Sequence, residues 1–184
     1  MSMFRAVVLA LCSLLATQAS LAAEFRMPLQ AQQVLVLDLP EGWSCQLRAA
    51  DAQGATTAAI SASDAKAFQL LVTPLPARGG NKPPSSDELR ALVHAAADKA
   101  RPRATEAELA LHELGAAARH GYYFSATDAH PEPGGWRHMS QGALGLGPLT
   151  VTFTVLIAGE PAARLAQSLE LIRSMRLGAA GAAR

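Results

Sequence analysis

The segment from Leu149 to Ala158 constrains the fold more than any other part of the chain. Large apolar side chains occupy every second position, and threonines fill most of the positions between them. Because successive side chains of a β-strand point to opposite faces, this alternation predicts a strand with one apolar face and one polar face. It is the strongest strand signal in the sequence, and the strand is expected to be the last.

Shorter apolar runs bounded by turn residues predict the other strands. The turn from Pro40 to Gly42 separates the first two, which we expect to pair as antiparallel neighbours. Pro74 and Pro76 are expected to end the strand that begins at Phe68. The expected strands span residues 33–39, 43–48, 58–61, 68–73, 108–114, 121–127 and 136–143.

Two segments have the period of an amphipathic helix. Ser85 and Glu88 form the pattern of a capping box, so a helix is expected to begin there and to end at Arg101-Pro102. A second helix is expected after Pro161, a residue that the first turn of a helix tolerates. The apolar faces of both helices are expected to pack on the sheet. These faces comprise Leu89, Leu92, Val93, Ala96 and Ala97 in the first helix and Leu165, Leu169, Ile172 and Met175 in the second.

These elements indicate an α+β domain in which helices pack on an antiparallel β-sheet. The regular alternation of strand and helix that builds a parallel nucleotide-binding sheet does not occur in the sequence. The sequence also shows no repeat of fixed period and no linker long enough to divide it. We therefore expect one domain over residues 23–177, followed by a disordered tail of glycine, alanine and one arginine at 178–184.

Residues 1–22 have the order of a secretory signal peptide. A single basic residue, Arg5, precedes an apolar run from Ala6 to Ala16, and small and polar residues follow it. Cleavage is expected after Ala22, with Ala23 as the alternative. The run is shorter than the ~20 apolar residues that span a bilayer, and Cys12 lies inside it, where it does not fit a lipidation site. The mature chain is therefore expected to be soluble and either periplasmic or secreted, without a lipid anchor.

Composition limits the classes of partner. The chain has 16 basic and 15 acidic residues, and Arg5 leaves with the leader, so the mature protein carries no net charge. It lacks the excess of basic residues that a general nucleic-acid binder needs. Cys45 is then the only cysteine, which excludes an intramolecular disulfide. Its thiol is either a small core group or an exposed group able to pair between chains.

Three short motifs accompany this order of elements. They are Leu39 to Trp43 at the first turn, Gly121 to Phe124 followed by Thr127-Asp128, and Gly142 ahead of Thr152 to Thr154. Together they make the chain similar to the PsbP-like or Mog1-like fold, including its bacterial secreted branch and the DcrB-type envelope proteins. The resemblance implies an antiparallel sheet between helices and a role in binding or assembly, since family members bind photosystem proteins or a small GTPase. It carries over no catalytic residue, and it leaves the partner of an exported protein open.

Titratable residues gather in one stretch of the chain. His120, Asp128, His130, Glu132 and His138 fall within 19 residues, and zinc sites use imidazole and carboxylate ligands. Their spacing matches no short zinc motif, and the prolines and glycines among them are typical of an exposed loop. We therefore assign no metal and no cofactor. A metal-dependent hydrolase that uses the region from His120 to His138 stays as an alternative function.

The sequence contains no pattern of nucleophilic catalysis or phosphate binding. It has no Gly-x-Ser-x-Gly motif, and Cys45 has no histidine nearby in the sequence. Gly142, Gly145 and Gly147 lie between two strands, where we expect a hairpin connection in place of a phosphate-binding loop. The chain is therefore not expected to be an enzyme.

Residues in and around the loop from Asp128 to Trp136 are the candidates for a binding surface, because loops on a rigid sheet often carry binding groups. We expect an exported, noncatalytic interaction or assembly module of the cell envelope whose partner the sequence does not name. A carrier of a small apolar ligand held between helix and sheet is a further alternative. Trp136 is open to two interpretations, a binding anchor or a core side chain. The candidate binding residues are Tyr122, Tyr123, His130, Trp136 and Arg137.

Overall fold

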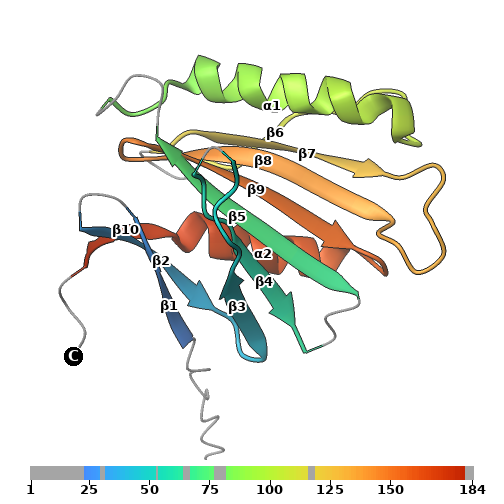
Figure 1. Ribbon diagram of the computed structural model, residues 1–184. Coiled ribbons are helices and arrows are strands. Elements are labelled where there is room, and N and C mark those ends of the chain that lie inside the picture. The colour runs from blue at the N-terminus through green and yellow to red at the C-terminus, as the bar shows by residue number, and fades with distance from the viewer. Residues whose placement is uncertain are drawn as a thin grey trace, which may run out of the picture.

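The computed structural model describes residues 23–29, 32–52, 54–63, 67–76, 82–115 and 119–180. In this part the chain forms two antiparallel sheets and two α-helices, so it is the α+β protein that the sequence predicts (Figure 1). Helix α1 lies on one face of the larger sheet. Helix α2 packs against both the larger sheet and the smaller one, on the opposite face.

The smaller sheet has three strands in the order β1-β2-β10, and the larger has seven in the order β3-β4-β5-β9-β8-β7-β6. The smaller sheet consists of β1 (Ala23–Pro28), β2 (Gln33–Leu39) and β10 (Arg176–Ala179). The larger consists of β3 (Trp43–Leu47), β4 (Ala58–Ala62), β5 (Phe68–Pro76), β6 (His112–Glu113), β7 (Gly121–Thr127), β8 (His138–Leu146) and β9 (Leu149–Ile157). The helices are α1 (Ser86–Ala100) and α2 (Ala162–Ser174), and a 3-10 turn, η1 (Arg101–Arg103), follows α1 directly.

The main core lies between the larger sheet, α2 and the smaller sheet. The alternation in β9 puts Phe153 and Val155 into this core, where they cluster with Phe68 of β5 and Ile172 of α2. A second, smaller cluster forms on the other face, where side chains of α1 pack with Phe124 of β7. The larger sheet is therefore apolar on both faces where a helix covers it.

Helix α1 begins with the capping box that the sequence predicts. The backbone N–H of Glu88 donates to Ser85 Oγ (3.3 Å), and the backbone N–H of Ser85 donates to Glu88 Oε2 (2.7 Å). The apolar face is narrower than predicted. Leu89 and Val93 are buried, but Leu92 is 42% exposed, so the expectation of a buried Leu92 is wrong. A helix that lies flat on two strands buries a stripe of residues four apart, and Leu92 falls beside that stripe.

The two strands on either side of Gly42 do not pair with each other. Both edges of β2 are occupied, by β1 on one side and by β10 on the other, so β3 has no free edge of β2 to join. Instead β3 pairs with β4 in the larger sheet. The turn from Pro40 to Trp43 therefore carries the chain from one sheet to the other.

Two strands run past the residues that were expected to end them. Pro74 and Pro76 lie within β5 and pair with β9, but in the described part of the chain β4 pairs with β5 only at Leu70–Val72. The prolines therefore sit where β5 is an edge and no backbone N–H is needed on the open side. Gly142 lies inside β8 and not in a connection, and it pairs with Tyr123 and Phe153. A Cβ at this position would collide with the backbone oxygen of Tyr122 and the ring of Phe153, so the position favours glycine. The strand expected at 108–114 is shortened to β6.

The predicted tail also contains ordered structure. Gly178 and Ala179 belong to β10 and pair with Val34 and Gln33 of β2, and the N–H of Ala180 donates to the carbonyl of Gln32. The expectation of disorder from residue 178 is therefore wrong for residues 178–180. Residues 181–184 and the expected leader, 1–22, lie outside the described residues.

Cys45 lies at the margin of the main core. It is half-buried and packs against the core cluster. Its environment is therefore intermediate between the core position and the exposed position that the sequence leaves open. Burial raises the pKa of its thiol to about 11, so the thiol is protonated at neutral pH. None of the helices in the described part of the chain has the length and apolarity needed to cross a membrane.

Candidate functional site

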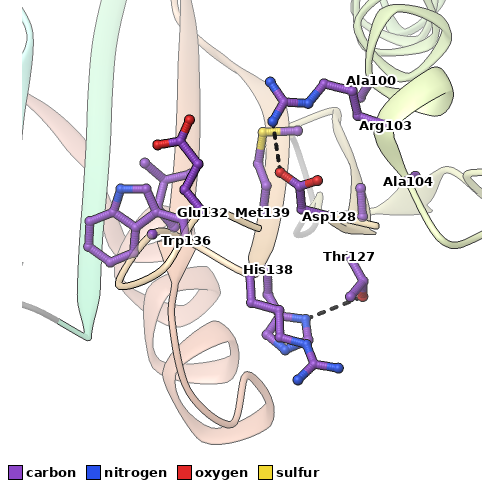
Figure 2. Close-up of a pocket in the computed structure, with 13 residues that line it drawn as sticks. Ala100, Arg103, Ala104, Thr127, Asp128, Glu132, Trp136, His138 and Met139 are labelled. Atoms are coloured by element: carbon purple, nitrogen blue, oxygen red, sulfur yellow. Dashed lines mark hydrogen bonds and ion pairs between the residues drawn. The ribbon is translucent and has the colours of Figure 1, made fainter. Parts of the chain in front are cut away.

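A hollow with a volume of about 440 Å³ lies at one end of the larger sheet, among the described residues. The end of α1 and the turn η1 form one side of it, and the ends of β7 and β8 form the other (Figure 2). We call it the Trp136 hollow. It is lined by Ala100, Arg103, Ala104, Ala126, Thr127, Asp128, Glu132, Gly135, Trp136, Arg137, His138, Met139 and Leu156.

Backbone hydrogen bonds fix the frame of the Trp136 hollow on its α1 side. Pro102 lies in η1, where the helix ends and the chain turns toward β7. Ala104 then forms a β-bridge with Asp128, and the N–H of Ala129 donates to the carbonyl of Arg103 (2.8 Å). A guanidinium nitrogen of Arg103 lies 3.0 Å from Asp128 Oδ2. The end of α1 is thereby fixed to the start of the loop that follows β7.

This loop, residues 128–137, is held at both of its ends. The N–H of Asp128 donates to the carbonyl of Arg137 (2.8 Å), and the N–H of Arg137 donates to the carbonyl of Ile157 (3.1 Å). Within the loop, the N–H of His130 donates to Asp128 Oδ1 (3.0 Å). Gly134 turns the chain with a φ of 75°, a conformation that favours glycine. The loop therefore presents its side chains from a fixed backbone.

The floor of the Trp136 hollow is apolar and its rim is charged. Trp136, Met139 and Leu156 are half-buried, and neighbouring alanines leave room above them. Figure 2 shows Trp136 and Glu132 on one side of Met139, with the ion pair of Arg103 and Asp128 on the other. Such a site suits an apolar group that enters between charged neighbours.

The hollow contains some of the sequence-predicted binding residues. Trp136 and Arg137 both line it. Tyr122 lies under α1, where its hydroxyl is 2.7 Å from Ser86 Oγ, and Tyr123 faces the other side of the sheet with its ring 5.1 Å from the ring of His112. His130 is exposed on the loop and does not line the hollow. The five candidates therefore do not form one surface.

The residues of the alternative metal site are also not brought together. Among the described residues, no group of three histidine, cysteine, aspartate or glutamate side chains lies close enough to hold a metal ion. The backbone of His120 pairs with Gly145, near the end of β8 that is remote from the loop. His138 instead forms a contact with Thr127, whose Oγ1 lies 3.3 Å from His138 Nδ1.

Sequence reasoning missed Arg103, Met139 and Leu156. Leu156 carried a signal, because it is an apolar residue on the face of β9 that otherwise bears threonine. Arg103 carried none, since its place depends on the bridge between Ala104 and Asp128, two residues far apart in the chain.

A carboxylate stabilises the frame close to the hollow. Both oxygens of Glu106 accept from the backbone N–H of Thr127, at 3.2 and 2.9 Å. Partial burial acts to raise the pKa of Glu106, but these hydrogen bonds outweigh it and lower the pKa below its ordinary value. The segment after η1 is thereby held against the end of β7.

Comparison with known proteins supports the fold. A scan against known protein families and a search of curated proteins find no match. A solved structure that is similar to this chain is the solution structure of a cyanobacterial PsbP protein, CyanoP from Synechocystis sp. PCC 6803. The TM-score is 0.56 and the sequence identity is 11%, and the match covers 88% of this chain and 96% of that chain. At this identity the likeness shows the fold alone, and the chain has a PsbP-like fold.

Proposed function

We propose that this protein is an exported, noncatalytic interaction or assembly module of the cell envelope, and that it binds its partner at the Trp136 hollow. One observation carries the proposal. The half-buried indole of Trp136 lines an open hollow whose frame is fixed by backbone hydrogen bonds on both sides. A rigid aromatic side chain in such a place loses little conformational freedom when a partner covers it.

The chemistry of the hollow supports binding to another macromolecule. Trp and Arg are enriched among the residues that dominate binding energy at protein interfaces, and Trp136 and Arg137 are neighbours that both line this hollow. Arg103 and Glu132 add exposed charges of both signs around the apolar floor. An apolar centre with a charged rim is the usual arrangement of a protein interface.

Export is proposed from the sequence of the leader. Arg5, the apolar run from Ala6 to Ala16 and the small residues up to Ala22 support removal of residues 1–22 and release into the periplasm or the medium. Intact-mass analysis of the exported protein is expected to find a chain that begins at Ala23 or Glu24. A mature chain that retains Met1, or that carries acyl groups, would refute this part of the proposal.

Site-specific photo-crosslinking tests the binding surface. A photoreactive residue in place of Arg137 is expected to give a discrete crosslinked product in the envelope fraction. The same residue in place of Glu170, which is exposed on α2, is the matched control and is expected to give none. Trp136→Ala, added to the chain with the photoreactive residue at position 137, is expected to lower the yield of the crosslinked product at least about tenfold, as for a central interface residue. Equal products at both positions would contradict the proposal.

A carrier of a small apolar ligand is the second candidate. The Trp136 hollow lies between the end of α1 and the sheet, and its volume of about 440 Å³ falls within the range of small-molecule sites. Native mass spectrometry of protein isolated from its own envelope distinguishes the candidates. A bound small molecule that Trp136→Ala releases would favour the carrier. No observation in the described residues favours the metal-dependent hydrolase.

A further inference from the structure

A second, smaller hollow lies on the face of the larger sheet that α2 covers. It has a volume of about 120 Å³ and is found where the end of β7 and the start of β8 meet the first turn of α2. We call it the polar hollow. It shares Ala126, Thr127, His138 and Met139 with the Trp136 hollow, so the two hollows meet at the same strand ends. Ser125 and Ser140 line the polar hollow and do not line the Trp136 hollow.

Four polar side chains gather in the polar hollow, on two cross-strand pairs. Ser125 pairs with Ser140, and Thr127 pairs with His138. Elsewhere the same face of the sheet is apolar, as at Leu144 on β8. Hydroxyl and imidazole groups lose hydration when they are buried at the margin of an apolar core, and this costs free energy unless hydrogen-bond partners replace the water. The sequence therefore places hydrogen-bonding groups here that the packing of the core does not require.

These side chains keep hydrogen-bonding capacity after they have paired with each other. Ser140 is 6% exposed, and its Oγ lies 2.7 Å from Ser125 Oγ. Each hydroxyl owns one proton, and only one of the two lies between the oxygens, so the pair has a second proton to donate. The contact from Thr127 Oγ1 to His138 Nδ1, at 3.3 Å, leaves the other ring nitrogen of His138 unused among the described residues.

The charges and walls of the polar hollow select its occupant. Among the described residues, no aspartate or glutamate lines it, and His138 is the one ionisable residue that does. Ile157, Pro161 and Leu165 form an apolar wall opposite the hydroxyl groups. A ligand that accepts hydrogen bonds at one end and is apolar at the other fits both sides. The volume exceeds what one water molecule needs, so the hollow has room for a small ligand.

We propose that the polar hollow binds a free short-chain monocarboxylate of the size of acetate or propionate. The carboxylate oxygens accept hydrogen bonds from the Ser125–Ser140 pair and from the ring of His138, and the alkyl end contacts Leu165. The first turn of α2 assists, because Pro161 supplies no side-chain cap and the N–H groups of that turn point toward this end of the helix.

Titration of the purified protein with sodium propionate, followed by ¹H–¹⁵N NMR, tests the proposal. The backbone amides of Ser125, His138 and Ser140 are expected to shift saturably, with a dissociation constant on the order of 1 mM for a ligand of this size. Sodium chloride at equal ionic strength is expected to cause no saturable shift. Propionamide has the same shape without the charge, and it is expected to bind at least about tenfold more weakly.

Two variants assign the binding to this hollow. The double variant Ser125→Ala with Ser140→Ala is expected to weaken propionate binding at least about tenfold. Leu165→Trp fills the hollow but keeps its polar groups, so it is expected to abolish propionate binding. It provides the test if the double variant does not fold. Trp136→Ala lies in the other hollow and is expected to leave propionate binding unchanged.

Several results would overturn the proposal. Equal binding of propionate and propionamide would show that the carboxylate is not recognised, and a titration without saturation up to about 100 mM would leave the hollow a site for water alone. Propionate binding that survives Leu165→Trp would place the ligand elsewhere. Acetylated Ala-Ala with a free C-terminal carboxylate, binding more tightly than propionate, would assign the hollow to a peptide end and not to a free acid.

Discussion

The two faces of the larger sheet differ in how completely they are covered. On the face toward α2, the side chains of β5 and β9 are buried in one core with the smaller sheet, as Phe68 and Phe153 show. On the opposite face, α1 lies over β7 and β8 (Figure 1). Thr152 and Thr154 of the neighbouring β9 remain half-buried. The α2 face therefore carries most of the stability. The α1 face ends in the Trp136 hollow, where we propose that the partner binds.

Adjacent substitutions in β9 give the largest expected contrast between the faces. Phe153 is 2% exposed in the main core, so Phe153→Ala is expected to lower the free energy of unfolding by about 3 to 5 kcal/mol. Thr154→Ala, one residue further on the other face, is expected to cost less than about 1 kcal/mol. Urea unfolding measures both. Similar losses of unfolding free energy at the two positions would show that the two faces contribute equally to stability.

Helix α1 offers a second matched pair, with two leucines on one helix. Leu89 is 1% exposed and Leu92 is 42% exposed. Leu89→Ala is therefore expected to cost about 2 to 5 kcal/mol, and Leu92→Ala less than about 0.5 kcal/mol. If Leu92→Ala proved the more costly in urea unfolding, the orientation of α1 on β7 and β8 would be wrong.

The close approach of β7 and β9 to β8 can be tested by a substitution at Gly142. A methyl group there would collide with the backbone of Tyr122 and with the ring of Phe153. Gly142→Ala is expected to cost about 1 to 3 kcal/mol, as overpacking does. Gly159 is the control, because a Cβ there meets no atom of the described residues within 4 Å and its backbone needs no positive φ. Thermal unfolding that is equally affected by both variants would count against the register of β8 with β7 and β9.

The smallest expected effect is the pH dependence due to Glu106, near the Trp136 hollow. Its pKa is lower in the folded chain than in the unfolded chain, so its contribution to stability is present above the unfolded pKa and is lost as the pH falls through the folded pKa. The stability difference between the native protein and Glu106→Gln is expected to shrink between about pH 6 and about pH 3. Urea unfolding at several pH values measures it, and a constant difference would exclude this role of the hydrogen bonds from Thr127.

The sequence predicted elements whose signal is local. The capping box of Ser85 and Glu88, the turn residue Pro161 and the alternation in β9 each act over a few residues, and the structure contains each of them. Alternation reports which face of a strand is apolar, but it does not report the neighbouring strand. The pairing of β2 with β10 joins residues over a hundred positions apart, so it had no local signal.

The candidate site was predicted in part for the same reason. Trp136 and Arg137 stood out as residues beside a loop, and the structure places both at the hollow. Tyr122 and Tyr123 are neighbours in sequence, yet adjacent residues of a strand face opposite sides, and each found a different partner. The wall formed by Ala100 and Arg103 depends on how α1 lies across the sheet, which no motif encodes.

The two tryptophans test the central claim most directly, because one lies in the core and the other at the hollow. Trp43 is 8% exposed, and its ring centroid lies 4.6 Å from that of Phe68. Trp43→Ala is expected to cost about 3 to 5 kcal/mol of folding free energy. Trp136→Ala is expected to cost less than about 1.5 kcal/mol and still to remove the crosslinked product formed from position 137. A loss of stability at Trp136 equal to that at Trp43, or an undiminished product, would contradict the account.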